Sequence, residues 1–187
     1  GGAVDPETGI MYIFSKSDVG RMSMSNRPDR SDMDYINLQS RNAPRLFVDG
    51  LPLIKPPYGQ IVALDLNEGE KLWDAVHGET PDSIRNHPAL EGLDIPATGQ
   101  AGRVGVLLTK TLVIAGDGGS YTNADGEQEA LLRAYDKFTG EQLGSLAMPA
   151  QQTGSPMTYA IDGVQYLAVA ISGGDVPGRL RIYSYEP

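Results

Sequence analysis

The stretch ALDLNEGEKLW, from Ala63 to Trp73, decides the fold, because the chain repeats it as AYDKFTGEQLG from Ala134 to Gly144. The two copies align without a gap and place Asp65 opposite Asp136. In each copy, apolar and polar residues alternate up to the aspartate, a glycine-containing turn follows, and a second strand begins, which predicts a β-hairpin. Repetition of this unit predicts similar sheets laid side by side, so function is expected where the sheets meet.

The turns of this repeat have their own chemistry. The aspartate is expected to accept hydrogen bonds from backbone N–H groups of the turn, and the glycine four residues later is expected to adopt a positive φ. A partial third copy, AVDPETGIMYI, stands near the start of the chain, with Asp5 and Gly9 at the same spacing. The sequence therefore predicts three related hairpin turns.

Trp73 is the only tryptophan of the chain and ends the first copy of the repeat. In repeated β-sheets an aromatic residue at this position docks between neighbouring sheets, so Trp73 is interpreted as a packing residue rather than a ligand contact. The second copy has Gly144 there. We therefore expect one seam between sheets with this docking contact and one without it.

Composition limits the class of protein. The chain has 187 residues, 40% of them hydrophobic, and no apolar run long enough for a transmembrane helix. Its 23 glycines and 13 prolines favour short turns and an all-β fold. A net charge of −9 argues against nucleic acid as the main partner, because binding phosphates needs a clustered positive surface. The absence of cysteine excludes disulfides and thiol chemistry.

Three sheet-forming regions are predicted, at about residues 1–73, 103–148 and 154–187, with inserted loops at about 16–42 and 77–102. A strand over Arg45–Val48 is assigned to the first region, one short helix is expected near Ser83–Arg85, and Asp162-Gly163 is expected to form a tight hairpin turn. Four-stranded sheets of this size, arranged around an axis, are typical of a β-propeller.

GSPMTYAIDGVQYLAVAISGG, from Gly154 to Gly174, closely resembles the last blade of the pyrroloquinoline quinone (PQQ)-dependent dehydrogenases. YGQIVALDLNEGEKLW resembles a tryptophan-docking motif of the same family, and GGAVDPETGIMYI resembles the blade before it. The resemblance covers nearly the whole chain and is nearest to the glucose dehydrogenase type.

This resemblance implies an eight-bladed propeller that holds PQQ on its axis near a calcium or magnesium ion. It implies that the chain is the C-terminal part of a periplasmic sugar or alcohol dehydrogenase, which passes electrons to a membrane quinone or cytochrome. Three blades cannot close such a ring, so the open faces are expected to meet the remaining blades or to self-associate. The isolated chain is predicted to be inactive.

Few functional residues of the family carry over to this chain. The catalytic aspartate and the metal ligands have no counterpart here. Gly102 and Arg103 match a stretch that lies beneath the quinone in alcohol-oxidising members, which often have a tryptophan where Gly102 stands. Gly173 and Gly174 match a glycine pair near the cofactor, followed in glucose dehydrogenases by a histidine that Asp175 replaces here. These five residues are the candidate cofactor contacts.

Alternatives stay open at several of these positions. Arg103 could hold a quinone carboxylate bidentately or form a surface ion pair, and Asp175 could contact the site or cap a turn. The segment 117–129 lacks the spacing of a calcium loop and is interpreted as a solvated acidic hairpin. His77 and His87 are assigned to a connecting loop without a catalytic role. For the whole protein, the alternative function is a non-catalytic propeller that binds other proteins.

Overall fold

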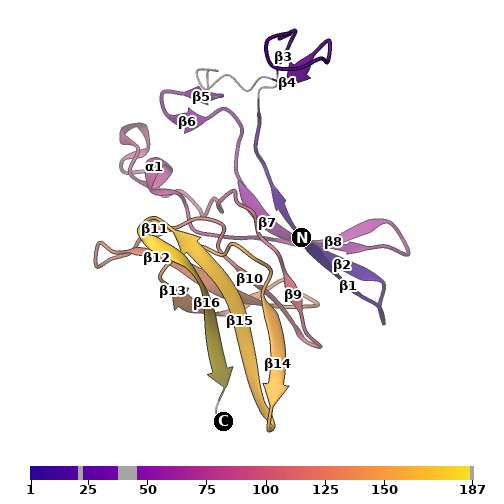
Figure 1. Ribbon diagram of the computed structural model, residues 1–187. Helices are drawn as coiled ribbons and strands as arrows, with labels where there is room; N and C mark the ends of the chain where they lie inside the picture. Colours follow the sequence, from indigo (N-terminus) through magenta and orange to yellow (C-terminus); the bar gives the residue numbers. More distant parts are fainter. Residues whose placement is uncertain (21–22, 38–45, 186–187) are drawn as a thin grey trace. The chain divides into compact units, whose positions relative to one another are not determined.

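The computed structural model describes residues 1–20, 23–37 and 46–185, and nearly all of its regular structure is β-strand (Figure 1). The chain divides into two compact units. The first consists of Gly1–Ser17 and Pro56–Pro187, and the second of Asp18–Lys55. The prediction of an all-β fold is therefore confirmed.

The first unit contains three antiparallel sheets, and the first two have the same strand order. The first sheet has the order β1-β2-β7-β8, with β1 Gly2–Asp5, β2 Ile10–Lys16, β7 Gly59–Asp65 and β8 Glu70–Val76. The second has the path β9-β10-β12-β13, with β9 Leu107–Leu108, β10 Leu112–Gly116, β12 Gln128–Asp136 and β13 Gln142–Met148. A short strand, β11 (Tyr121–Thr122), pairs with the start of β12.

The repeated phrase forms the outer hairpin of both sheets. Ala63 pairs with Trp73 in the β7–β8 hairpin, and Ala134 pairs with Gly144 in the β12–β13 hairpin. In each case a register shift directly follows the alanine. The hairpins predicted from the repeat are confirmed, and the two copies share the position of the register shift as well.

The third sheet has three strands among the described residues, one fewer than the path through each of the first two sheets. Its order is β14-β15-β16, with β14 Met157–Ile161, β15 Val164–Gly173 and β16 Val176–Tyr185. The predicted tight turn at Asp162-Gly163 is confirmed, with φ values of 50° and 81° that suit a two-residue hairpin.

The second unit contains two small hairpins, each with strands of two residues. They are β3 (Met24–Ser25) with β4 (Ile36–Asn37), and β5 (Phe47–Val48) with β6 (Leu51–Pro52). The assignment of Arg45–Val48 to the first sheet is therefore wrong, and Arg45 itself lies outside the described residues. Asp49 and Gly50, with φ of 49° and 90°, close a local turn, and local closure costs far less entropy than pairing with a distant strand.

The long insertion between β2 and β7 leaves and re-enters the first unit at neighbouring points. The backbone N–H of Ser17 donates to the carbonyl oxygen of Tyr58 at 3.1 Å. The ladder between β2 and β7 runs without interruption up to the pair Lys16 and Gly59. The pairing of the first sheet therefore continues to the point where the chain departs.

The three aspartate–glycine turns are built alike, as predicted. In each, the glycine N–H donates to the aspartate carbonyl oxygen at 2.8 to 3.0 Å, and the glycine φ is 73° to 75°. The aspartate side chain accepts from one or two backbone N–H groups of the turn. The pairs are Asp5 with Gly9, Asp65 with Gly69, and Asp136 with Gly140.

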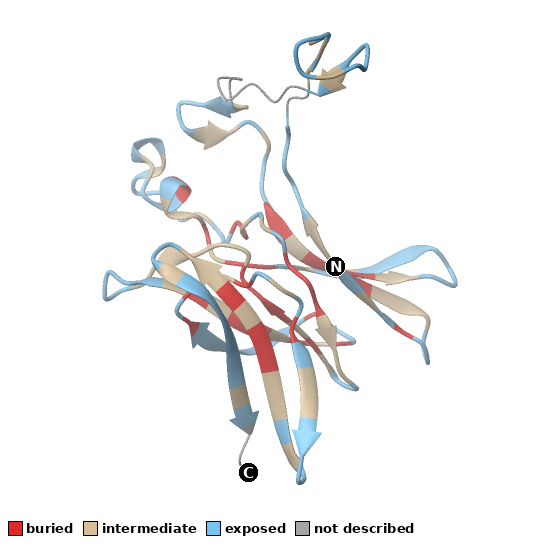
Figure 2. Cartoon of the chain, in the orientation of Figure 1, coloured by how far each residue is buried: buried red, intermediate tan, exposed pale blue. Residues whose placement is uncertain are grey.

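Buried apolar residues form two clusters, one between the first and second sheets and one between the second and third, and Figure 2 shows the buried positions along the strands. In the first seam, Trp73 lies 5.9 Å from the Tyr12 ring between centroids, and its Nε1 donates to the Lys137 carbonyl oxygen of the second sheet. A Cβ at Gly140 would lie 2.6 Å from the indole ring, so only glycine fits beneath it. Trp73 thus docks on the turn of the second repeat, which confirms its predicted role.

The second seam lacks this contact. A Cβ built at Gly144 would meet no atom within 4 Å. A groove of about 640 Å³ lies between the second and third sheets, lined by apolar residues that include Ile114, Leu146 and Leu167. The missing aromatic therefore coincides with an incompletely filled seam.

A buried ion pair also joins the first two sheets. The Nζ of Lys137 lies 2.8 Å from Oδ2 of Asp5, and both side chains are 7% exposed. The hydrogen bond from Lys137, supported by the N–H of Glu7, lowers the pKa of Asp5 to about 2.

We expect this pair to stabilise the fold in a defined pH range. Because the folded-state pKa of Asp5 lies below its unfolded value, its contribution is fully present above about pH 4 and is lost as the pH falls towards 2. Urea midpoints measured across this range should show the wild type losing more stability than Asp5→Asn, whose side chain cannot titrate. Parallel curves for the two proteins would contradict this assignment.

Candidate functional site

The long connections of the first unit gather at one end of the sheets, and the short hairpin turns, except the one between β15 and β16, lie at the other (Figure 1). The loop end holds the connections from β8 to β9, β10 to β12 and β13 to β14, and the β15–β16 turn. The connection after β8 contains a helix, α1 (Asp82–Arg85), which matches the predicted position, and a short 3-10 helix, η1 (Pro88–Leu90).

Glycines at the loop end allow neighbouring backbones to touch. A Cβ at Gly102 would lie 2.5 Å from the Cα of Gly118, and one at Gly99 would lie against the carbonyl oxygen of Gly59. Next to the contact between Gly99 and Gly59, the N–H of Gln100 donates to the carbonyl oxygen of His77 at 3.0 Å. Only glycine permits such contacts, which explains the glycine-rich sequence of these connections.

The predicted site residues lie on two segments of this end. Gly102 and Arg103 precede β9, and Gly173, Gly174 and Asp175 form the β15–β16 turn. Arg103 is exposed, and among the described residues no ion pair or hydrogen bond involves its side chain. Gly174 and Asp175 are exposed, and the two glycines have φ values of 151° and 55°.

Backbone hydrogen bonds connect the two segments in steps. Gly102 lies against Gly118, and the carbonyl oxygen of the preceding Asp117 accepts from the N–H of Gln152 at 2.9 Å. The neighbouring Gln151 accepts from the N–H of Ser172 at 3.1 Å. The structure therefore links the two groups of candidate residues through Gln151 and Gln152.

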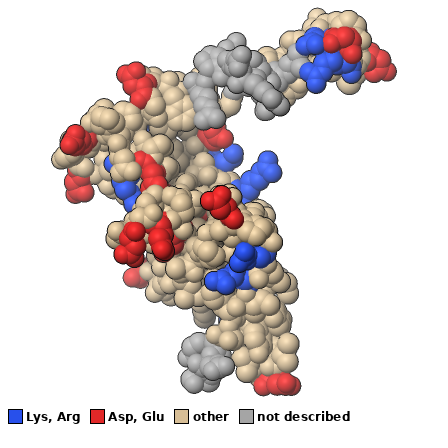
Figure 3. Space-filling model, turned by 60° about the vertical axis from the view of Figure 1, so that its left-hand side comes forward, with Lys and Arg blue, Asp and Glu red and all other residues tan. Residues whose placement is uncertain are grey.

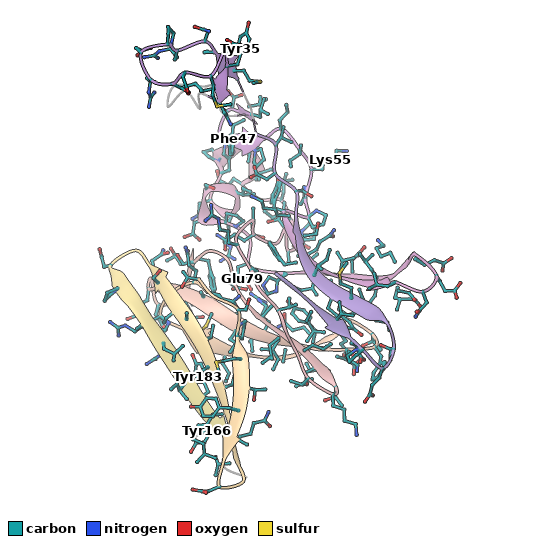
Figure 4. All side chains as sticks on the ribbon, turned by 45° about the vertical axis from the view of Figure 1, so that its right-hand side comes forward. Tyr35, Phe47, Lys55, Glu79, Tyr166 and Tyr183 are labelled. Carbon is teal, nitrogen blue, oxygen red and sulfur yellow. The ribbon has the colours of Figure 1, made fainter. Side chains whose placement is uncertain are left out.

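A buried ionic cluster supports these loops from below. Asp117 is fully buried and accepts from Nε of Arg133 at 2.8 Å and from the N–H of Leu131 at 3.0 Å. Arg133 also binds Glu79 of the β8–β9 connection at 3.0 Å, and Figure 4 labels Glu79 among the side chains at this end. The interpretation of 117–129 as a solvated hairpin is therefore wrong for Asp117, although its tip is exposed.

His77 belongs to the same buried layer. Its Nε2 lies 3.1 Å from the carbonyl oxygen of Gly116, which can only accept, so this nitrogen carries the proton. Its Nδ1 then accepts from the Tyr135 hydroxyl at 2.8 Å. Burial lowers the pKa of His77, which keeps the ring neutral in this tautomer. His77 thus connects the first sheet to the second, a role that its loop position in the sequence did not indicate.

The connection after β8 is fixed to the second sheet as well. The Asp82 carboxylate accepts from the N–H of Thr122 at 3.0 Å and from its hydroxyl at 2.6 Å. The guanidinium of Arg85 lies 5.6 Å from the centre of the Tyr121 ring. His87 accepts from the N–H of Ala89 and caps η1, in agreement with its predicted structural role.

The charged groups at this end are acidic for the most part. On the face that Figure 3 shows, aspartate and glutamate are spread widely and the basic side chains form small groups. Among the described residues, no three acidic or histidine side chains lie close enough together to hold a metal ion. No helix among them is long and apolar enough to cross a membrane.

A sequence model described as "Glucose/ethanol/alcohol dehydrogenase, beta-propeller domain" of the PQQ class matches residues 1–167. The chain belongs to this PQQ β-propeller family. Each sheet of the first unit is therefore a propeller blade, and the second and third sheets repeat the architecture of the first with the differences described above.

Relatives of the family include the quinoprotein glucose dehydrogenase of Escherichia coli, 32% identical over 131 residues that cover 66% of this chain and 14% of that protein. The glycerol dehydrogenase large subunit of Gluconobacter thailandicus is 31% identical over 66% of this chain and 16% of its own length. The crystal structure of quinohemoprotein alcohol dehydrogenase from Comamonas testosteroni matches 98% of this chain and 25% of its own, with 18% identity and a TM-score of 0.60. The chain thus spans a small part of the length of its relatives.

Sequence reasoning missed His77, Arg133 and Gln152. A signal existed for Arg133, because a charged residue interrupts the apolar strand LLRAY and buried charges are rare unless paired. None existed for Gln152, which is polar and stands in a loop. Its burial, 2% exposed, becomes visible only in the folded chain.

Proposed function

We propose that this chain forms part of a PQQ-dependent dehydrogenase that oxidises a sugar or an alcohol. The observation that carries the proposal is the connection of the Gly102–Arg103 and Gly173–Asp175 segments, through Gln151 and Gln152, at the loop end of a PQQ-family propeller. Glucose, glycerol and alcohol dehydrogenases all occur among the related proteins, which supports this substrate class without choosing within it.

The residues at the loop end fit the chemistry of PQQ, an orthoquinone that carries carboxylates. Arg103 offers an exposed guanidinium that no carboxylate of the described residues occupies, and guanidinium binds carboxylates bidentately. Gly102 packs backbone against backbone on Gly118, which holds the segment that carries Arg103 close to the end of the second sheet. When bound, PQQ would supply the two-electron oxidant, while this chain would hold and orient it.

Other components of the reaction are assigned to residues beyond this chain. The general base and the calcium or magnesium ligands have no counterpart among the candidates, so the remaining blades are proposed to supply them. A periplasmic location and a membrane quinone or cytochrome as electron acceptor belong to the same proposal.

The first and third sheets each present an apolar face that their neighbouring sheet leaves uncovered. On the third sheet, Met157 and Ile182 flank Ala168 on the face opposite Val169 of the core. Leu180 is on the same side, and all three large side chains are more than half exposed. Val4, Leu72 and Val76 are exposed on the first sheet. We propose that these faces pack against the remaining blades or, without them, against a second copy.

The isolated chain is expected to self-associate through these faces. Ile182→Glu places a charge in the apolar face and should weaken association at least about tenfold, because a buried unpaired charge is costly. Analytical ultracentrifugation measures the change. Gln165→Glu adds the same charge at an exposed polar position of the same sheet and should leave association unchanged. A monomeric wild-type chain would contradict the proposal.

The isolated chain should not oxidise substrate. With PQQ, calcium and either glucose, glycerol or ethanol, dye reduction is expected to stay at the rate of PQQ alone, because the base and the metal ligands are proposed to lie on the other blades and the described residues hold no group of side chains that could bind a metal ion. A full-length protein carrying the chain should reduce the dye with one of these substrates. Failure of the full-length protein with PQQ bound would overturn the proposed reaction, and turnover by the chain alone would overturn the division of roles.

A further inference from the structure

Gln152 is a buried amide whose hydrogen bonds reach two separate parts of the loop end, the segment before β9 and the end of β10. Its side chain is almost completely buried, in the connection between β13 and β14. Its Nε2 donates to the carbonyl oxygen of Gly105 at 2.8 Å, and its Oε1 accepts from the N–H of Gly116 at 2.6 Å. Its own N–H donates to the carbonyl oxygen of Asp117.

The Gln152 side chain packs so closely on Gly116 that no side chain fits at Gly116. A Cβ at Gly116 would lie 2.8 Å from Oε1 of Gln152 and 3.0 Å from the methyl carbon of Met148. The carbonyl oxygen of Gly116 accepts a hydrogen bond from His77, so both the N–H and the carbonyl of Gly116 are bound. His77, Gly116 and Gln152 therefore form one hydrogen-bonded group, which runs from the end of the first sheet through the second sheet to the connection before the third.

The two segments that hold the candidate cofactor contacts are both hydrogen-bonded to Gln152 or to its neighbour Gln151. Gly105 ends the stretch that begins with Gly102 and Arg103, and the carbonyl of Gly105 is a direct partner of Gln152. On the other side, Gln152 bridges to Ile171, and Ser172 binds Gln151 directly before the Gly173–Gly174 turn. A Cβ at Gly173 would lie 3.2 Å from the Gln151 side chain.

We propose that Gln152 is a positioning residue, which fixes the Gly102–Gly105 segment relative to the Gly173–Asp175 turn so that both meet one PQQ molecule. This role rests on the proposed function. Gln152 acts through the backbone of its neighbours and does not touch the cofactor. An amide is required because the side chain must donate at one end and accept at the other.

Gln152→Glu tests the requirement, because the two side chains have the same shape. The glutamate oxygen can still accept from Gly116, but at pH 8 it faces the Gly105 carbonyl without a proton. Hydrogen exchange measured on the chain should then show that the backbone N–H groups of residue 152 and of Ser172 are protected from exchange about tenfold less than in the unmodified chain. At about pH 5 a buried carboxyl binds a proton and can donate to Gly105, so protection should recover. A packing defect would not recover with pH.

PQQ binding in the full-length protein, measured by equilibrium dialysis, supplies the second readout. Gln152→Glu should bind PQQ about tenfold more weakly at pH 8 and near normally at about pH 5. Gln165→Glu is the matched control, since Gln165 also donates from Nε2 but is exposed, and it should bind normally at both pH values. If Gln152→Glu does not fold at pH 8, Gln152→Asn replaces it, with an amide too short for both contacts and an expected loss at both pH values.

Each outcome decides a separate point. If the exchange rate of the Ser172 N–H is the same in Gln152→Glu as in the unmodified chain, the claim that Gln152 fixes these segments is overturned, regardless of the PQQ affinity. Altered exchange with normal PQQ affinity overturns the positioning role alone. Absence of PQQ binding by the unmodified full-length protein overturns the proposed function and with it the positioning of PQQ, while the exchange result still shows whether the segments are held.

Discussion

Arg133→Met should lower the free energy of unfolding of the chain by about 3 to 5 kcal/mol. The substitution removes the partner of Asp117, a carboxylate with no solvent exposure that accepts two hydrogen bonds from the Arg133 guanidinium. Methionine fills much of the same space, so the cost arises from the unpaired buried charge rather than from a cavity. Urea denaturation followed by circular dichroism measures it.

Two further variants separate this cause from others. Arg27→Met removes an arginine from the exposed pair with Asp29 and should cost about 1 kcal/mol or less. Combining Arg133→Met with Asp117→Leu removes both charges and should recover part of the loss. A single variant as stable as the wild type, or a double variant less stable than Arg133→Met, would contradict the assigned role of the cluster.

Trp73→Ala is expected to cost about 3 kcal/mol, because it removes the side chain that docks the first sheet on the second. The indole covers Gly140, contacts the Tyr12 ring and binds the Lys137 carbonyl, so its loss opens the seam in several directions. Thermal unfolding measured by circular dichroism should show a lower midpoint for the variant.

Comparison with the second seam gives the control for this prediction. Gly144 is the position equivalent to Trp73, and no atom lies near a side chain built there. Gly144→Ala should therefore change stability little, or raise it slightly by restricting the unfolded chain. If Trp73→Ala proved equally harmless, the docking of Trp73 would not stabilise the seam.

The parts of the fold that were predicted correctly are those with signals close together in the sequence. The hairpins at Asp65 and Asp136 depend on alternation and turn chemistry within about ten residues, and both were predicted correctly. The strand near Phe47 was predicted at the right place but with the wrong partner, although Asp49-Gly50 is itself a local turn signal that pairs this strand with Leu51–Pro52.

The candidate site was predictable only in part, for a related physical reason. The family resemblance selected Arg103 and Gly173, which lie at the loop end in the structure. The residues that hold this end together are paired over long distances along the chain: His77 with Tyr135 across 58 residues and Gln152 with Gly105 across 47. Such contacts depend on the assembled sheets, so neither composition nor spacing could have revealed them.

The hydrogen bond between Ser17 and Tyr58 joins the two points where the chain leaves and re-enters the first blade, and this bears on which changes of sequence length the blade tolerates. Because the chain departs and returns at hydrogen-bonded neighbours, the register of β2 and β7 is closed within the blade, and loop-closure entropy grows only slowly with the length of a connection. We therefore expect the blade to tolerate replacement of the segment 18–55. Evolution or an engineer could shorten it, lengthen it or replace it with a foreign domain while the register of β2 and β7 stays the same.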